Sequence, residues 1–202
     1  MTDRQTLYTG ISRAAWGYLF LCVDFNLNQV SILPRFAGWL LFLSAIEKLK
    51  EERRDLALLR PLGVLLALWT GADWLASWVG GDVDGHFLPL DLIVAVAQLY
   101  FLFQFLTDLA ALAESLCPAP EGPLLRGRIL RCRTVQTLLV TALDLVLYLP
   151  VSPQLPEAVS RGVPLVLALV YCLLGVCLMF TLFRLRKGLR DAPPPEGAPE
   201  QS

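Results

Sequence analysis

The chain has 202 residues, of which 55% are hydrophobic and only 17% are charged. Soluble domains carry about 25% charged residues, so this composition argues against a water-soluble globular domain and favours a membrane protein. The formal net charge of −1 is uninformative as a total, because the positions of the charges matter more in a membrane. We expect the lipid bilayer as the main partner, and no nucleic acid.

Cysteine and histidine usage bears on metal and redox chemistry. The single histidine is His86, and the five cysteines form no CxxC pair: Cys22, Cys117, Cys132, Cys172 and Cys177. A zinc framework or a disulfide scaffold needs paired or clustered ligands, which this sequence lacks. We therefore predict no metal site and no cofactor.

Six stretches approach the ~20 apolar residues that a membrane-spanning helix needs. They are residues 14–27, 34–49, 61–79, 88–112, 134–149 and 163–183. The N-terminal MTDRQTLYTGISR is too long and polar for a signal-peptide n-region, so we expect the first segment to be retained. The same segment carries Asp24, Asn26 and Asn28, and either a tilted span or one arm of a re-entrant hairpin fits it.

Basic residues predict the orientation of these segments. Of the 17 lysines and arginines, all but Arg35 and Arg161 lie in the N-terminus, the second and fourth connectors and the C-terminal end. Because basic residues near helix ends favour the cytoplasmic side, both termini are predicted to be cytoplasmic, with three hairpins whose tips face outward. The fold class is thus an all-α polytopic helical bundle. Residues 1–190 form one membrane domain, and the Pro-rich 191–202 forms a disordered cytoplasmic tail.

A weak threefold repeat places an aspartate in the first helix of each hairpin. Arg13 precedes Asp24 by eleven residues, and Arg133 precedes Asp144 by eleven. In the middle hairpin, Asp73 follows its arginine by thirteen residues. At 1.5 Å per residue, each acid lies roughly 16–20 Å beyond the basic ends, at similar depth. Chance similarity in so biased a composition is the alternative to a true repeat.

Polar side chains of the fifth segment share one helix face. Thr134, Thr137, Thr141, Asp144 and Tyr148 follow 3-4-3-4 spacing, which gives one stripe that lipid would not favour. Ionisable groups in a membrane are costly and face a partner or water. The stripe and the repeat together define a candidate ligand or ion site: Asp24, Asp73, Asp144, Thr137, Thr141 and Tyr148.

A structural interpretation competes with this site. The same acids near the outer interface could pair with Arg35 and Arg161, or accept hydrogen bonds from Thr and Tyr, and only hold the bundle together. The sixth segment adds a small-residue stripe, Ala168, Cys172 and Gly175, which lets helices approach closely.

Three function classes remain. The leading one is a non-enzymatic protein that binds a small ligand or cation and is related to transport. The alternative is a structural or assembly partner of another membrane protein, docked through the small-residue stripe of the sixth segment. A membrane-embedded enzyme comes third, because the sequence contains no HExxH, Walker A or GxGxxG motif and its only histidine lies in a Gly-rich loop.

The stretch GYLFLCVDFNLNQVSILPRFAGWLL, residues 17–41, contains a DF pair followed by ILPxFxG. It resembles the opening of a group of small uncharacterised multi-pass membrane proteins of Gram-positive bacteria; the match rests on Asp24, Phe25, Ile32, Leu33, Pro34, Phe36 and Gly38. That group often has an aspartate where this chain has Arg35. The resemblance implies the inner membrane of a bacterium and brings no established activity.

Overall fold

The described chain is almost entirely helical. The structure is a computed structural model that describes residues 4–22, 26–27, 30–31, 35–78, 88–148 and 157–191. The elements are α1 (Arg4–Cys22), β1 (Asn26–Leu27), β2 (Val30–Ser31), α2 (Arg35–Leu49), α3 (Arg54–Leu58), α4 (Arg60–Trp78), α5 (Leu88–Leu116), α6 (Glu121–Tyr148) and α7 (Glu157–Asp191). The predicted all-α class is confirmed, with one antiparallel pair of two-residue strands between α1 and α2.

Several helices extend beyond the apolar segments. α1 begins ten residues before the predicted segment and ends at Cys22. α6 begins at Glu121 rather than at position 134, and α7 runs from Glu157 to Asp191 rather than over 163–183. Arginine, lysine and glutamate are good helix formers, so a helix continues past its apolar part until a turn residue stops it. Hydropathy therefore locates these helices but not their ends.

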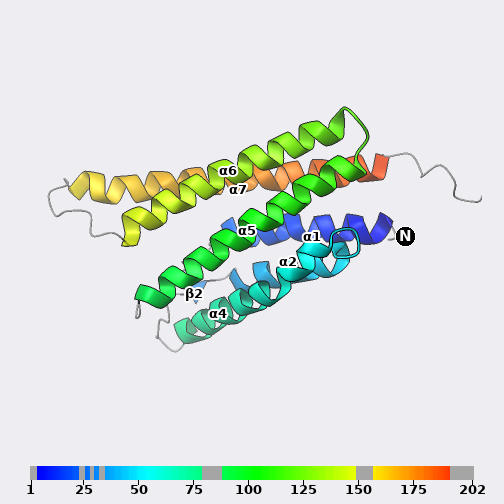
Figure 1. Cartoon of the computed structure of the whole chain (residues 1–202). Helices are drawn as coiled ribbons and strands as arrows, with labels where there is room; N and C mark the ends of the chain where they lie inside the picture. The colour runs from blue at the N-terminus through cyan, green and yellow to red at the C-terminus, as the bar shows by residue number, and fades with distance from the viewer. Residues whose placement is uncertain are drawn as a thin grey trace, which may run out of the picture.

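The six long helices form a closed ring of neighbours. α4 packs on α2, α2 on α1, α1 on α7, α7 on α6 and α6 on α5, and a smaller contact between α5 and α4 closes the ring. Figure 1 shows three antiparallel hairpins, α1–α2, α4–α5 and α6–α7. The start of α1 and the end of α7 lie at the same end of the bundle (Figure 1).

Aromatic side chains from three helices fill the centre of the bundle. Tyr18 of α1 lies edge-on to Phe42 of α2, with ring centroids 5.2 Å apart. Phe42 in turn contacts Phe101 and Phe105 of α5 at 5.8 and 5.0 Å. Trp39 adds a further edge-on contact with Phe101 at 5.2 Å. Edge-to-face pairs of this kind each contribute about 0.5–1.5 kcal/mol beyond their burial. They fix α5 against the α1–α2 hairpin.

Two glycines allow α1 and α2 to cross closely. A Cβ atom on Gly17 would lie 3.2 Å from the carbonyl oxygen of Gly38, and a Cβ on Gly38 would lie 3.1 Å from the carbonyl oxygen of Gly17. Both atoms met are backbone, which cannot rotate away. Glycine at both positions is therefore what the crossing requires.

The ILPxFxG segment has a structural explanation at two of its positions. Gly38 makes the crossing with α1, and Phe36, two residues earlier on α2, lies edge-on to Trp74 of α4 with centroids 5.4 Å apart. Phe36 also packs beside Gly71 of α4, where an added Cβ would lie at ordinary contact distance, 3.8 Å from Phe36 Cβ and 3.9 Å from Phe36 Cγ. These two positions hold α2 between α1 and α4.

Much of the outer surface is apolar. Exposed large hydrophobic side chains run along four helices, among them Leu65, Leu68, Ile93, Val96, Leu138, Leu145, Leu165, Leu169 and Leu173. Within the described residues, two stretches are long and apolar enough to cross a membrane, Pro89–Leu116 and Leu165–Arg190. Core helices of soluble proteins can be as long and apolar, but they are mostly buried, whereas only 33% and 22% of the residues in an apolar 18-residue window of these two stretches are buried. Their apolar faces are therefore on the outside, as in a protein surrounded by lipid.

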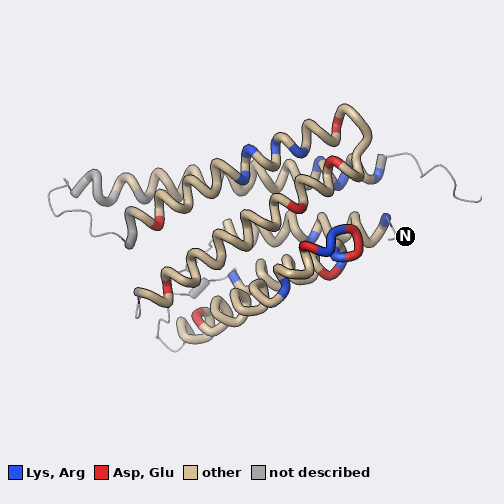
Figure 2. Tube along the Cα trace, viewed as in Figure 1, with Lys and Arg blue, Asp and Glu red and all other residues tan. Residues whose placement is uncertain are grey.

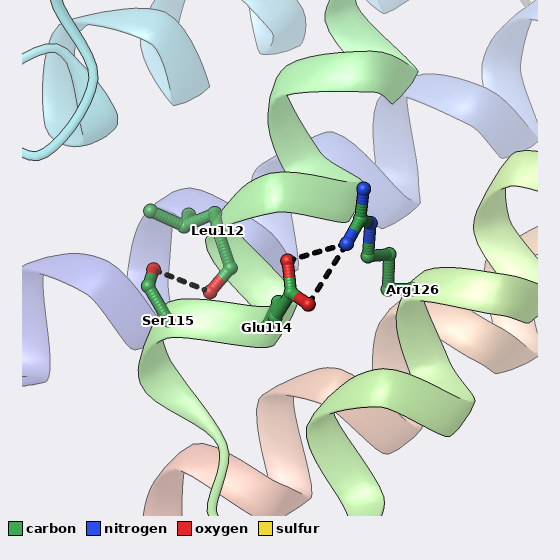
Figure 3. A network of polar contacts seen from close by, with 4 residues as sticks. All are labelled: Leu112, Glu114, Ser115 and Arg126. Atoms are coloured by element: carbon green, nitrogen blue, oxygen red, sulfur yellow. Dashed lines mark hydrogen bonds and ion pairs between the residues drawn. The ribbon is translucent and has the colours of Figure 1, made fainter.

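Charged residues are unevenly distributed along the bundle. Figure 2 shows lysines and arginines gathered toward the end where α1 begins and α7 ends. At this end the turn from α5 to α6 is held by Arg126, whose Nη1 donates to both carboxylate oxygens of Glu114 at 2.8 and 2.7 Å (Figure 3). Ser115 Oγ also donates to the carbonyl oxygen of Leu112 at 3.0 Å (Figure 3).

Arg186 joins the end of α7 to the start of α1. Its Nη1 donates to Ser12 Oγ at 3.1 Å, and its Nη2 donates to Tyr8 Oη. The guanidinium also lies 4.1 Å from the centre of the Tyr8 ring and 5.7 Å from that of Phe183. One side chain thus combines hydrogen bonds with stacking on two aromatic rings.

Candidate polar site between α5, α6 and α7

A small cavity lies between three helices of the ring. Its volume is about 70 Å³. Six of its lining residues are polar, and they come from α5 (Gln98), α6 (Arg133, Gln136, Thr137, Asp144) and α7 (Tyr171). The other lining residues are apolar, such as Leu102 and Val140.

The α6 side of the cavity follows from helical periodicity. Arg133, Thr137, Val140 and Asp144 are spaced 4-3-4, so they occupy one face of α6, and all four line the cavity. The arginine and the aspartate stand eleven residues apart, or roughly 16 Å along the axis. The cavity therefore has a cationic side chain toward one end and an acidic side chain toward the other.

Arg133 is held in place by α5. Its Nη1 donates to Thr107 Oγ1 at 2.8 Å, and its guanidinium lies 4.1 Å from the centre of the Phe103 ring. Arg133 Nε is buried and makes no hydrogen bond within the part of the chain that the structure describes. The side chain is thus anchored while one donor remains unused.

Gln136 is the most unusual residue of the site. Its side chain is 4% exposed, and its amide has one polar partner among the described residues, the hydroxyl of Tyr171, so most of its hydrogen-bonding capacity is unused. An unsatisfied buried polar group costs about 1–3 kcal/mol. Such a cost is tolerated in native proteins where water or a ligand satisfies the group. Gln136 therefore marks this cavity as a place for a polar guest.

The size of the cavity limits that guest. A water molecule needs roughly 10–15 Å³ of such space, so about 70 Å³ holds a few waters or a small ion with part of its hydration shell. Pockets for drug-sized ligands measure about 300–1,000 Å³. The cavity is too small for a ligand of that class.

The residues predicted from sequence are divided by the structure. Thr137 and Asp144 line the cavity, whereas Thr141 of the same stripe is exposed and is not part of the lining. Asp24 and the side chain of Tyr148 lie outside the described residues. Asp73 lies on α4, which packs on α2 and α5, whereas α6 packs on α5 and α7. Figure 1 shows α5 running between α4 and α6, so the helix that carries Asp73 and the helix that carries Asp144 lie on different sides of α5.

Four polar lining residues are not among the predicted site residues. Arg133 enters the predictions only as a residue of the basic end and as the arginine of the repeat, although its eleven-residue spacing from Asp144 places both on one face. Gln98, Gln136 and Tyr171 carry no signal in the sequence, because their role depends on how α5, α6 and α7 are arranged. Among the residues that the structure describes, no group of three or more His, Cys, Asp or Glu could hold a metal ion.

The small-residue stripe of α7 is used within the chain at two of its three positions. Cys172 Sγ donates to the carbonyl oxygen of Cys22 at 3.0 Å. Gly175 is buried where any Cβ atom would collide with the side chain of Cys22. Ala168 is exposed. The stripe therefore serves the contact between α1 and α7 over most of its length.

Comparison with known proteins adds no identification. No family model, no curated protein and no solved structure matches the chain. The function must be argued from the geometry.

Proposed function

We propose that this chain is a non-enzymatic membrane protein that binds a small cation or small polar molecule in the cavity between α5, α6 and α7, as part of a transport-related process. The observation that carries the proposal is the buried Gln136 amide, which lines this cavity and has more hydrogen-bonding groups than its one described partner, Tyr171, can satisfy. Asp144 supplies the negative charge for a cation, and Thr137 supplies a hydroxyl oxygen.

The proposal includes six membrane crossings, with both termini in the cytoplasm of a bacterium. The three antiparallel hairpins, the exposed apolar faces and the concentration of basic residues at one end support this placement. Reporter fusions at Gly85 and Ser202 test it. We expect position 85 outside and position 202 inside, and a cytoplasmic position 85 would overturn the topology.

The binding site is tested by cation-dependent thermal stability. The detergent-solubilised full chain is heated in NaCl, KCl or NH4Cl, with total ionic strength held constant by N-methylglucamine chloride. We expect one of the three cations to raise the midpoint of unfolding. The substitutions Asp144→Asn and Gln136→Leu should abolish that rise.

Asp73→Asn is the matched control, since it makes the same chemical change on the far side of α5. It should keep the full cation response. If Asp144→Asn responds like the wild type, or if Asp73→Asn loses the response as well, the cavity is not the site.

A second candidate function is suggested by the first half of α7. Leu165, Val166, Leu169, Val170 and Leu173 are all exposed and cover more than a narrow stripe of the helix. This surface supports a structural role in which another membrane protein covers α7. Purification in mild detergent distinguishes the two candidates: a stoichiometric protein partner would favour the structural role, and a response to small cations would favour the binding role.

A further inference from the structure

A second cleft lies at the basic end of the bundle, between the start of α6 and the end of α7. Its volume is about 370 Å³. It is lined by Glu121, Leu124 and Arg128 of α6 and by Arg184, Lys187 and Gly188 of α7. It is separate from the cavity described above, whose α6 residues begin at Arg133.

Three cationic side chains of this cleft are unpaired. Arg128, Arg184 and Lys187 are exposed and form no ion pair with any residue that the structure describes. Nearby Arg126 differs, because Glu114 neutralises it at 2.7 Å. Like charges that converge on one cleft repel each other, so an anion between them would be stabilised.

The single acid of the cleft does not remove this excess. Glu121 occupies the first turn of α6, where the helix dipole favours a carboxylate. No ion pair joins it to Arg128, Arg184 or Lys187. The lining therefore carries a net charge of two positive units, counted over these four side chains.

An apolar stripe leads directly into the cleft. On α7, Leu173, Phe180, Arg184 and Lys187 are spaced 7-4-3 and so share one face. Leu173 and Phe180 are 62% and 60% exposed. On α6, Leu124 inside the cleft is 60% exposed. Cationic groups above an exposed apolar strip match the two parts of an anionic phospholipid, a phosphate headgroup and an acyl chain.

We propose that this cleft binds a phosphate-type anion, supplied by the headgroup of an anionic phospholipid whose acyl chain lies along Leu173 and Phe180. Arg128, Arg184 and Lys187 hold the phosphate oxygens. The site anchors the C-terminal end of α7 to the membrane surface and makes the bundle sensitive to the charge of its lipids. This inference goes beyond the α5–α6–α7 cavity and does not depend on what that cavity binds.

The test compares lipids on the purified full chain. Delipidated protein in dodecyl maltoside is titrated with phosphatidylglycerol, phosphatidylcholine or inorganic phosphate, and binding is followed by native mass spectrometry and by the midpoint of thermal unfolding. The test variant is Arg184→Gln with Lys187→Gln. Since each basic side chain near an anionic surface contributes about fivefold in affinity, the double variant should bind phosphatidylglycerol about thirtyfold more weakly.

The matched control is Arg53→Gln with Arg54→Gln, which removes two charges near the start of α3, outside the cleft. It should bind phosphatidylglycerol like the wild type, and phosphatidylcholine should show no difference between the three proteins. If the double variant unfolds early even in phosphatidylcholine, Arg128→Gln replaces it, with an expected loss of about fivefold.

Each outcome decides one part of the proposal. Loss of phosphatidylglycerol binding in the cleft variant alone supports the lipid site. If inorganic phosphate competes at the same residues and phosphatidylglycerol has no advantage over it, the anion site stands and the lipid source is overturned. Equal losses in the cleft and control variants, or no loss in either, overturn the site.

Discussion

Replacing Gly17 with leucine should destabilise the bundle, because it forces apart the close crossing of α1 and α2. A Cβ at this position lies 3.2 Å from the carbonyl oxygen of Gly38 and 3.4 Å from the ring of Phe42, before the rest of a leucine is added. Overpacking at a site that cannot give way costs about 1–3 kcal/mol. Replacement of a helical glycine also brings a gain of about 0.5–1 kcal/mol, which any control must share.

Gly162 provides that control. It lies in α7, and a Cβ there would meet no atom of the described residues within 4 Å. Gly162→Leu therefore brings the helical gain without the clash. The two variants should differ by about 1–3 kcal/mol, or roughly 2–12 °C in the midpoint of unfolding at about 2–4 °C per kcal/mol.

The assay is thermal unfolding of the detergent-solubilised protein, followed by the fluorescence of its five tryptophans. Because the two glycines form one contact, Gly38→Leu should match Gly17→Leu, and the double variant should lose less than the sum of the single losses. Equal midpoints for Gly17→Leu and Gly162→Leu would show that α1 and α2 do not cross at these glycines.

Three further predictions concern thiols and the Arg186 contact. Cys132 of α6 and Cys177 of α7 are in contact, so mild oxidation with copper phenanthroline should remove both thiols together, as counted with a thiol-reactive mass tag. In the Cys177→Ser variant, the Cys132 thiol should stay free, and independent loss of the two thiols would contradict this packing. Arg186→Lys should lower the free energy of unfolding by about 1–2 kcal/mol, since a lysine keeps the charge but loses the stacking and the paired hydrogen bonds of the guanidinium. An unchanged midpoint of unfolding would show that Arg186 does not join α7 to α1 in this way. Burial raises the pKa of the Cys117 thiol, so the thiol stays protonated at neutral pH. Its alkylation rate should therefore reach half-maximum at a higher pH than that of free cysteine, and a half-maximum at the ordinary pKa would show that the thiol is not buried.

Helix positions were predictable from the sequence because apolar stretches of this length have few other uses. Helix ends were not, since the charged residues of 121–133 continue α6 as readily as apolar ones would. The sequence also does not predict the order of the helices around the ring. α4 and α5 are consecutive long helices, yet α5 packs more extensively on α6. Which helices pack together depends on how well their surfaces fit, as at the contact of Gly17 with Gly38, and hydrophobic periodicity carries no information on that fit.

The candidate site shows the same division. Helical spacing groups Thr137 with Asp144 on one face of α6, because residues on one helix keep a fixed geometry, and both residues line the cavity. The spacing could not bring Gln98 or Tyr171 to that face, since they belong to other helices. Nor could it relate Asp73 to Asp144, because similar depth along the bundle does not bring two helices into contact. An acid's depth is a property of the sequence, whereas its neighbours are a property of the fold.

The contact of Arg186 with Tyr8 and Ser12 has a consequence for how the protein is made. Arg186 follows Tyr8 by 178 residues and Ser12 by 174 residues in the sequence, so the ribosome synthesises the α1 side of this contact long before the α7 side. At about 5–20 residues per second, α1 waits roughly 10–35 s for α7. During that interval the face of α1 that α7 will cover has no native partner. Of the two helices joined by this contact, α1 is therefore made early yet completes its packing late, and its uncovered face must be protected during synthesis.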